Sequence, residues 1–226
     1  GRAATAEEIE SLSWFVRIYA NYVGLLDYSE FDTLTGLLNR KTFDDAFERL
    51  LAKTQDEHSA SSVERRRDSP SDWWMAVVDI DFFKRVNDNF GHLFGDEVLL
   101  RVANLMRESF RGYDLLFRFG GEEFVVMLHT ATEEGAKVAL DRFRQAVEKH
   151  VFPQVGQVTC SIGYTVVDPM SAQTDLLGQA DAALYWCKEN GRNRIGGYGR
   201  LVSGGQLKST TVEAVQPDID IDALFG

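Results

Sequence analysis

One stretch decides the fold of this chain: LFRFGGEEFVVML, residues Leu116–Leu128. It predicts two short apolar strands joined by a tight turn, in which Gly120 and Gly121 supply the positive φ that a two-residue hairpin needs. The adjacent carboxylates of Glu122 and Glu123 then lie at the hairpin tip, where like charges repel and reduce stability. Such a pair fits either a solvated acidic turn or a site for a hard divalent cation with oxygen ligands.

A second segment favours the metal site. The apolar run Trp74–Ile80 contains Asp79 and is followed by Asp81. A buried strand that stops in Asp-x-Asp places acids at the edge of a sheet. If this strand lies beside the hairpin, Asp79 joins Glu122 and Glu123 around one or two ions, which is the ligand composition of a Mg²⁺ site that handles nucleotide phosphates. We interpret Asp81 as structural, a carboxylate that caps the helix that follows.

Seven further motifs, in order, make residues 30–198 resemble the GGDEF-domain diguanylate cyclases. One such motif would be weak, whereas seven in order are strong. The family usually has Asp at the third position of its signature; Glu122 keeps the charge and reaches one methylene further. The matching motifs are Asp32–Arg40, Asp79–Asp88, Gly91-His92 with Gly95-Asp96, Arg111–Asp114, Ser161–Gly163, Ala183–Tyr185 and Lys188–Asn193.

The mixture of strand and helix patterns predicts an α/β fold with a central, mostly antiparallel sheet flanked by helices. The resemblance implies that this sheet is of the nucleotidyl-cyclase or polymerase-palm type. We expect a catalytic domain over residues 32–198, interrupted by a flexible polar loop at 53–73 that is rich in serine and arginine. Residues 199–226 predict a flexible acidic tail, which is also similar to the short acidic peptides with which flagellar switch proteins dock chemotaxis response regulators.

Residues 1–31 predict a helical stalk, because apolar residues recur at alternating steps of three and four. The stalk either packs on its own domain or pairs with a second subunit, and we favour a homodimer. Its wide apolar face, like the tail, also fits a regulatory partner protein. The seam consists of Ile9, Leu12, Val16, Tyr19, Val23 and Leu26.

Composition excludes several classes of function. The chain has 226 residues, a net charge of −11 and a pI near 4.8. Such a surface repels nucleic acid and anionic membrane. No run of about 18 apolar residues is present, so we expect no membrane span. No signal peptide is visible, and Cys160 and Cys187 make no disulfide framework. We therefore expect a cytoplasmic protein, and the resemblance implies that it is bacterial.

The resemblance implies a reaction: condensation of two GTP into cyclic di-GMP with release of two pyrophosphates, each subunit holding one GTP. In-line phosphoryl transfer mainly requires positioning and charge neutralisation. Asp79, the backbone carbonyl of Ile80 and Glu122 are the expected metal ligands. Two Mg²⁺ ions are expected per active site, with Mn²⁺ as the alternative. Glu123 binds the second ion or helps to deprotonate the attacking hydroxyl.

The same motifs supply substrate contacts. We expect Lys84, Lys188 and Arg192 to contact phosphates rather than form surface ion pairs. Asn87 and Asp96 are the expected guanine readers, because a carboxylate accepts from N1–H and the exocyclic amine of guanine, which adenine cannot offer. A cyclase with another nucleotide preference is the alternative. The other expected contacts are Leu34 and Phe83, which wall the base pocket, and Gly121, which lets the backbone approach the phosphates.

The Arg-x-x-Asp pair, Arg111 and Asp114, stands shortly before the hairpin. In the family this pair binds cyclic di-GMP and inhibits the enzyme, with the arginine stacking on the product and the aspartate reading its guanine. We expect Arg142 or Arg144 of another subunit to complete the site. The alternative function is a catalytically silent receptor that binds cyclic di-GMP here, but such members usually lose the acids that this chain keeps.

Overall fold

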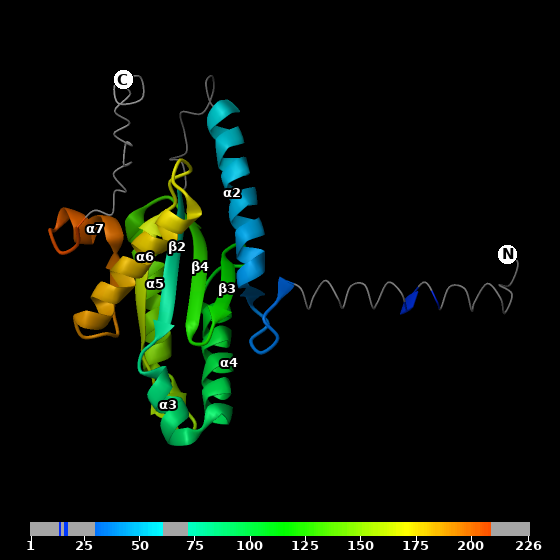
Figure 1. Ribbon diagram of the computed structural model, residues 1–226, viewed down its shortest axis with the longest axis vertical. Coiled ribbons are helices and arrows are strands. Elements are labelled where there is room, and N and C mark those ends of the chain that lie inside the picture. Colours follow the sequence, from blue (N-terminus) through cyan, green and yellow to red (C-terminus); the bar gives the residue numbers. More distant parts are fainter. Residues whose placement is uncertain (1–13, 15, 18–29, 61–71, 209–226) are drawn as a thin grey trace, which may run out of the picture.

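Strand β2 (Asp72–Ile80) lies at the centre of the fold (Figure 1). The computed structural model describes residues 14, 16–17, 30–60 and 72–208. Its main sheet has the strand order β1-β3-β4-β2-β7-β8. The β1–β3 and β7–β8 pairs are parallel and the three pairs between them are antiparallel, so the predicted, mostly antiparallel sheet is confirmed. The strands are β1 (Leu38–Asn39), β3 (Leu115–Gly120), β4 (Glu123–Thr130), β7 (Cys160–Val166) and β8 (Ile195–Gly197).

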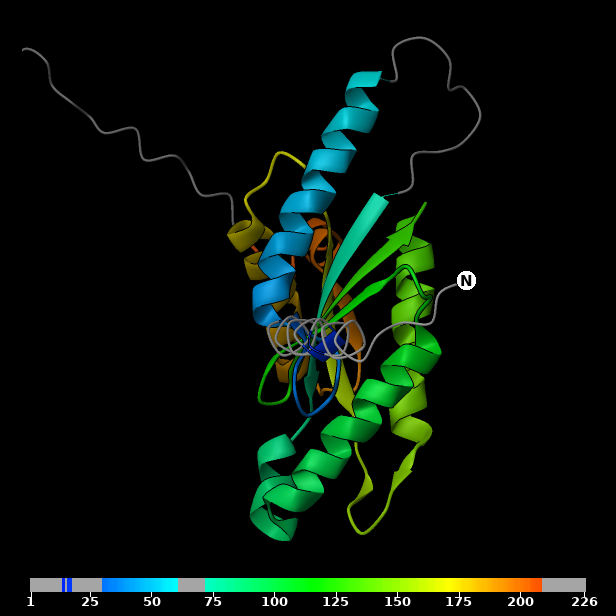
Figure 2. The ribbon, with the colours of Figure 1, turned by 90° about the vertical axis from the view of Figure 1, so that its right-hand side faces the viewer.

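Helices cover both faces of the sheet (Figure 1, Figure 2). One layer contains α3 (Phe83–Phe90), α4 (His92–Ser109) and α5 (Glu133–Lys149), and the other contains α2 (Arg40–Ala60) and α6 (Gln173–Glu189). Successive side chains of a strand point to opposite faces. In β2, Trp74, Ala76 and Val78 pack in the first layer, whereas Met75 and Val77 pack in the second. Asp79 continues the second series and therefore lies on the side of α6.

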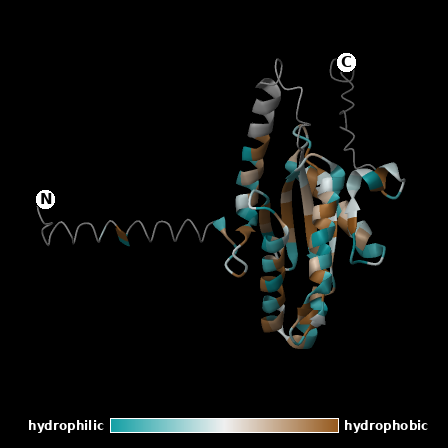
Figure 3. Ribbon diagram, turned by 180° about the vertical axis from the view of Figure 1, so that it is seen from behind, coloured by the Kyte–Doolittle hydropathy of each residue, from teal (hydrophilic) through white to brown (hydrophobic). Residues whose placement is uncertain are grey.

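The turn between β3 and β4 and the segment that follows β2 carry the predicted site residues, and both extend from the hydrophobic centre of the sheet. Figure 3 shows hydrophobic residues concentrated along the central strands, between helices of mixed polarity. The hairpin of β3 and β4 is confirmed, with Gly121 and Glu122 between the two strands. Gly120 (φ 142°) and Gly121 (φ 52°) both have the positive φ that the turn requires. Beyond β2, the chain enters α3 and turns at Gly91 (φ 87°) into α4.

The catalytic domain differs from the predicted boundaries at two places. The predicted loop over 53–73 is wrong at both ends, because α2 continues through Ala60 and β2 begins at Asp72. Apolar anchors in the first half of α2 hold the helix, and backbone hydrogen bonding extends it into the polar sequence. The predicted tail begins too early: helix α7 (Tyr198–Ser203) buries Tyr198 and Leu201 against α6. The glycines that follow suggested a tail, but these two apolar side chains are spaced to reach the same neighbour.

A small sheet of β5 (Val151–Phe152) and β6 (Gly156–Gln157) follows α5. No helix in the described ranges combines the length and apolar character needed to cross a bilayer. Most of the predicted stalk, residues 61–71 of the predicted loop, and the tail from 209 onward lie outside the described residues.

Candidate active site

The predicted carboxylates converge at one end of the sheet. Asp79 of β2 pairs in register with Glu123 of β4, and Glu122 precedes it in the turn. Facing residues of antiparallel strands have Cβ atoms roughly 4.5–5.5 Å apart. Asp79 is only 6% exposed. Its Oδ2 accepts a hydrogen bond from Lys188 Nζ of α6 at 2.8 Å.

The electrostatics of Asp79 show an excess of negative charge. Burial raises the pKa of its carboxyl to about 6, and the nearby carboxylates of Glu122 and Glu123 add to the rise, although Lys188 opposes it. Asp181 of α6, which sequence reasoning missed, belongs to the same cluster: burial and the charge of Glu123 raise its pKa. A bound cation would relieve this repulsion.

The donor chemistry fits a hard cation such as Mg²⁺, which prefers oxygen ligands. The side chain of Ile80 is 1% exposed and lies in the core, so only its backbone carbonyl could serve as a ligand. Within the described ranges, no three acidic, histidine or cysteine side chains already stand in metal-binding geometry. Lys188 instead acts as the counter-ion of Asp79 in this state.

The predicted guanine readers belong to the two helices that meet at Gly91, Asn87 to α3 and Asp96 to α4. A Cβ added to Gly95 would lie 2.0 Å from Asn87 Oδ1 and 3.3 Å from Phe83 Cζ. Only glycine permits this approach of α4 to Asn87, and Asp96 is the next residue of α4. Asn87 is half-buried and Asp96 is exposed. Leu34 is half-buried and packs against the core that contains Phe83.

Phe82, at the N-terminal end of α3, carries an exposed aromatic ring that sequence reasoning did not select. Phe83 is 5% exposed and packs in the core beside Gly95. Phe82 is 48% exposed and has a left-handed backbone (φ 58°). The guanidinium groups of Arg85 and Arg192 lie 4.4 Å and 4.5 Å from the centre of its ring. The ring of Phe82 is exposed where the backbone is left-handed, and no sequence pattern predicts that backbone conformation.

The predicted phosphate contacts come from both helical layers. Lys84 is exposed in the first turn of α3, beyond the end of β2. Lys188 comes from α6, and Arg192 from the loop that follows it. Lys188 reaches Asp79 directly, and Arg192 lies over Phe82. Lys188 and Arg192 therefore lie at the end of β2 at which the acids gather, and Lys84 follows that end in the chain.

A third missed feature is Arg118, which fixes the hairpin turn. Its guanidinium donates to the carbonyl of Gly121 at 2.9 Å and 3.2 Å, and to Asp32 Oδ1 at 3.0 Å. Asp32 also accepts from the backbone and hydroxyl of Thr35. The turn that carries Glu122 is thus tied to the segment that precedes β1.

Asp81 is structural, as predicted, but it does not cap α3. The N-cap position of α3 is Phe82, which makes no side-chain capping bond. The buried carboxylate of Asp81 accepts instead from Thr159 Oγ1, from Ser161 Oγ and from the backbone N–H of Asn193. It therefore joins β7 to the loop after α6, a long-range connection that local sequence could not reveal.

The Arg-x-x-Asp pair lies at the opposite end of β3 from Glu122. The backbone N–H of Arg111 donates to Asp114 Oδ2 at 2.8 Å, and the guanidinium of Arg111 contacts Tyr113. Arg111, Asp114 and Arg142 line one surface pocket of a single chain, so a second subunit is not needed to bring Arg142 to the pair. Arg142 also donates to the carbonyl of Ser109.

Comparison with known proteins identifies the family of this chain. Residues 29–194 match the family described as diguanylate cyclase, GGDEF domain. The chain is 40% identical over 167 residues to diguanylate cyclase DgcP of Pseudomonas aeruginosa, covering 73% of this chain and 23% of that protein. It spans about half or less of the length of the curated relatives it matches.

Solved structures show the same fold. The coiled coil and GGDEF domain of DgcB from Caulobacter crescentus, in complex with c-di-GMP, superposes with a TM-score of 0.74 at 27% identity, over 85% of this chain and 97% of that chain. Diguanylate cyclase SiaD of Pseudomonas aeruginosa, in complex with its activator SiaC, gives 0.61 at 32% identity, over 84% and 73%. The chain described here belongs to the GGDEF-domain family of diguanylate cyclases.

Proposed function

We propose that this chain is an active diguanylate cyclase, which condenses two GTP into cyclic di-GMP and releases two pyrophosphates. The observation that carries the proposal is the cross-strand pairing of Asp79 with Glu123, with Glu122 in the adjoining turn. A silent receptor would not need this costly arrangement of like charges, whereas a metal-dependent phosphoryl transfer does.

We assign Asp79, the carbonyl of Ile80 and Glu122 to a bound Mg²⁺, and Glu123 to a second ion, with Mn²⁺ as the alternative. Cyclases of this family are metal-dependent. When bound, such ions neutralise the phosphates and polarise the α-phosphate. The shared excess of negative charge around Asp79 supports this assignment.

The protein's own groups bind and orient GTP in this proposal. Asn87 and Asp96 read guanine at the corner of α3 and α4, supported by Phe83 and bordered by Leu34. Lys84, Lys188 and Arg192 neutralise the triphosphate, and the backbone of Gly121 approaches it without a side chain in the way. Glu123, which is exposed at the start of β4, can accept the proton of the attacking 3′-hydroxyl.

The reaction requires two copies of the chain, since each holds one GTP and the product joins two. We propose that the helix predicted over residues 1–31 pairs the two copies. The activator bound to SiaD shows that a relative is controlled by a partner protein. A regulatory partner on the stalk or on the acidic tail of this chain is the corresponding proposal.

We further propose that cyclic di-GMP inhibits the enzyme at the pocket of Arg111, Asp114 and Arg142. Both arginines can donate to phosphate bidentately, and Asp114 can accept from guanine. Asp114 is partly engaged, because its Oδ1 accepts from the backbone N–H of His129 at 3.3 Å and its Oδ2 from that of Arg111. These bonds hold its carboxylate in place at the pocket wall.

The test is turnover by purified protein with Mg²⁺ and GTP, with ATP in a parallel reaction. We expect cyclic di-GMP from GTP only, and a loss of at least ~10³-fold in Glu122→Ala, since a metal contributes several kcal/mol to transition-state stabilisation. A dimeric preparation that binds cyclic di-GMP but converts no GTP would overturn the proposal in favour of the silent receptor.

A further inference from the structure

The loop that carries Arg192 has an unusual backbone. Arg192 (φ 61°) and Asn193 (φ 44°) are consecutive non-glycine residues in the left-handed region, directly after Gly191 (φ 109°). L-residues rarely adopt this conformation, and Asn does so more readily than Arg. Such conformations persist only where the surrounding structure fixes them. The contacts of Asn193 show what fixes this loop.

The side-chain amide of Asn193 is bound at both ends by α5. Its Nδ2 donates to Glu148 Oε1 at 2.7 Å, and its Oδ1 accepts from an amino group of Arg144 at 2.6 Å. The same Arg144 amino group donates to Glu148 Oε2 at 2.8 Å. Hydrogen bonds from Asn193 and Arg144 lower the pKa of Glu148, so this carboxylate is ionised at neutral pH. The three side chains form a closed, charge-assisted set.

The backbone of the loop is fixed as firmly. The N–H of Asn193 donates to buried Asp81 at 3.0 Å. The N–H of Arg192 donates to the carbonyl of Cys187 at 2.9 Å, and the carbonyl of Arg192 accepts from Arg194 Nε at 3.2 Å. Both backbone groups of Arg192 are therefore hydrogen-bonded, and its side chain extends toward the ring of Phe82.

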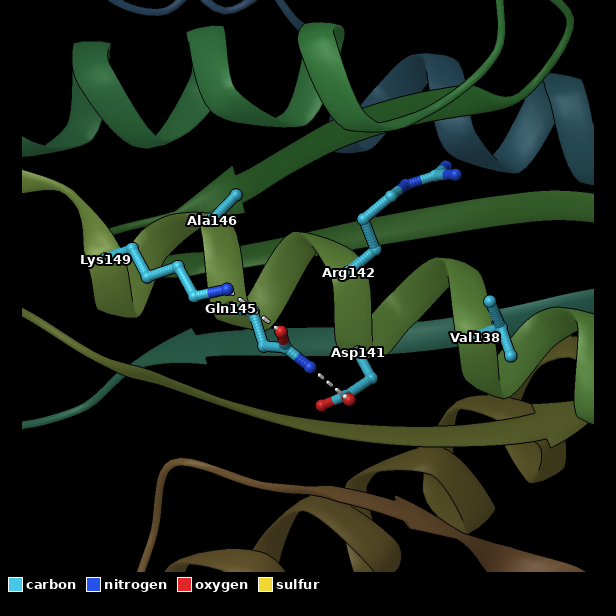
Figure 4. A pocket seen from close by; sticks show the side chains of 6 residues that line it. All are labelled: Val138, Asp141, Arg142, Gln145, Ala146 and Lys149. Carbon is cyan, nitrogen blue, oxygen red and sulfur yellow. Dashed lines mark hydrogen bonds between the residues drawn. The ribbon is translucent and has the colours of Figure 1, made fainter.

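Arg144 and Glu148 lie apart from the product pocket. Figure 4 shows that Arg142 projects away from Asp141 and Gln145, which are hydrogen-bonded to each other. Arg144 also pairs with Asp141 at 2.7 Å, a contact that does not involve Asn193. The helix thus presents Arg142 to the product pocket and Arg144 with Glu148 to the loop after α6.

We propose that Arg144 and Glu148 are positioning residues for GTP: by holding Asn193 they keep Arg192 directed at the triphosphate. This inference rests on the proposed function, in which Arg192 contacts phosphate. Neither residue touches the substrate. Their contribution reaches it through the loop, so removing either one should weaken recognition of phosphates and leave recognition of the base intact.

The test compares two ligands with the full chain. Binding of a non-hydrolysable GTP analogue is measured by calorimetry, and binding of guanosine by ligand-detected NMR, for wild type, Arg144→Met and Glu148→Ala. We expect the analogue to bind about tenfold more weakly to both variants, as expected when a charge-assisted contact is misplaced. Guanosine affinity should stay within about twofold, because its base pocket is built from α3 and α4. Asp141→Asn is the matched control, since it removes the charge of the carboxylate that pairs with Arg144 apart from Asn193 and Glu148, and it should bind both ligands like wild type.

A double-mutant cycle identifies the route of the effect. In an Arg192→Gln background, Arg144→Met should cause no further loss of analogue affinity, because the positioned group is already absent. Additive losses, or equal losses for guanosine and the analogue, would overturn the inference. If Arg144→Met does not fold, Asn193→Gly replaces it: glycine adopts the positive φ freely but lacks the anchoring amide, and the same selective loss is expected.

The two proposals can fail separately. Wild-type protein that converts GTP, combined with variants that bind the analogue normally, would contradict the positioning role alone. Wild-type protein that binds no GTP analogue would remove both the proposed function and this inference.

Discussion

Replacing Gly163 with alanine should force α6 away from the sheet. Gly163 lies in β7, opposite Val77 of β2. A Cβ at this position would lie 2.1 Å from the carbonyl oxygen of Ala180 and 2.2 Å from the backbone nitrogen of Leu184. Both atoms belong to the backbone of α6, so no side-chain rotation can relieve the clash. The helix or the strand must move.

The expected magnitude follows from these contacts. Overpacking a core costs about 1–3 kcal/mol, and a clash with helix backbone belongs at the upper end, about 3 kcal/mol. For a domain of this size, about 1 kcal/mol shifts Tm by roughly 2–4 °C, so Gly163→Ala should lower Tm by roughly 6–12 °C. Gly178→Ala is the matched control, because Gly178 is an exposed glycine of the same helix with nothing within 4 Å of an added Cβ. It should raise stability by up to about 1 kcal/mol.

Differential scanning calorimetry and GTP binding measure the two consequences. Because α6 carries Lys188 and leads into Arg192, Gly163→Ala should also bind GTP more weakly below its melting temperature. Gly178→Ala should bind GTP like wild type. A Gly163→Ala protein that melts at or above the wild-type temperature would refute the close packing of α6 on β7 and the reasoning drawn from it.

Three further predictions concern the site. Lys188→Met should lower Tm in EDTA by roughly 4–8 °C, because it leaves Asp79 without its counter-ion at a cost of about 2 kcal/mol, below that of a fully buried pair since Lys188 is partly solvated. An unchanged melting temperature would contradict this pairing. Arg111→Ala should raise the half-inhibitory concentration of cyclic di-GMP at least about tenfold in turnover assays; inhibition at the wild-type concentration would argue against the pocket. Phe83→Ala should cost about 3–5 kcal/mol in denaturant unfolding, whereas Phe82→Ala should cost less than about 1 kcal/mol and instead weaken nucleotide binding. Equal destabilisation by the two substitutions would contradict the burial of Phe83 and the exposure of Phe82.

Sequence alone predicted the hairpin and the strand of Asp79, because both rest on local signals. Paired glycines determine where the turn falls, and an apolar run that ends in carboxylates marks a strand edge. The pairing of Asp79 with Glu123 was an inference from these two segments, and the register of β2 with β4 confirms that they meet.

What the sequence could not supply depends on contacts between distant segments. Of the two neighbouring phenylalanines, Phe82 is exposed and Phe83 is buried. This difference accompanies a left-handed backbone at Phe82, which neither hydrophobic periodicity nor residue propensity predicts. The hydrogen bonds of Asp81 join residues about 80 and 112 positions apart in the chain. The packing of α7 on α6 likewise depends on a contact between distant segments. Its two apolar residues, Tyr198 and Leu201, lie in a short glycine-containing segment whose helix propensity is low.

The central claim is that Asp79 and Glu122 hold a divalent cation against the phosphates of GTP. A crystal structure of the protein with Mg²⁺ and a non-hydrolysable GTP analogue tests it most directly. We predict a metal ion about 2.1 Å from a carboxylate oxygen of each residue, with guanine between Asn87 and Asp96. A triphosphate bound elsewhere, or a metal ion that contacts neither carboxylate, would contradict the account.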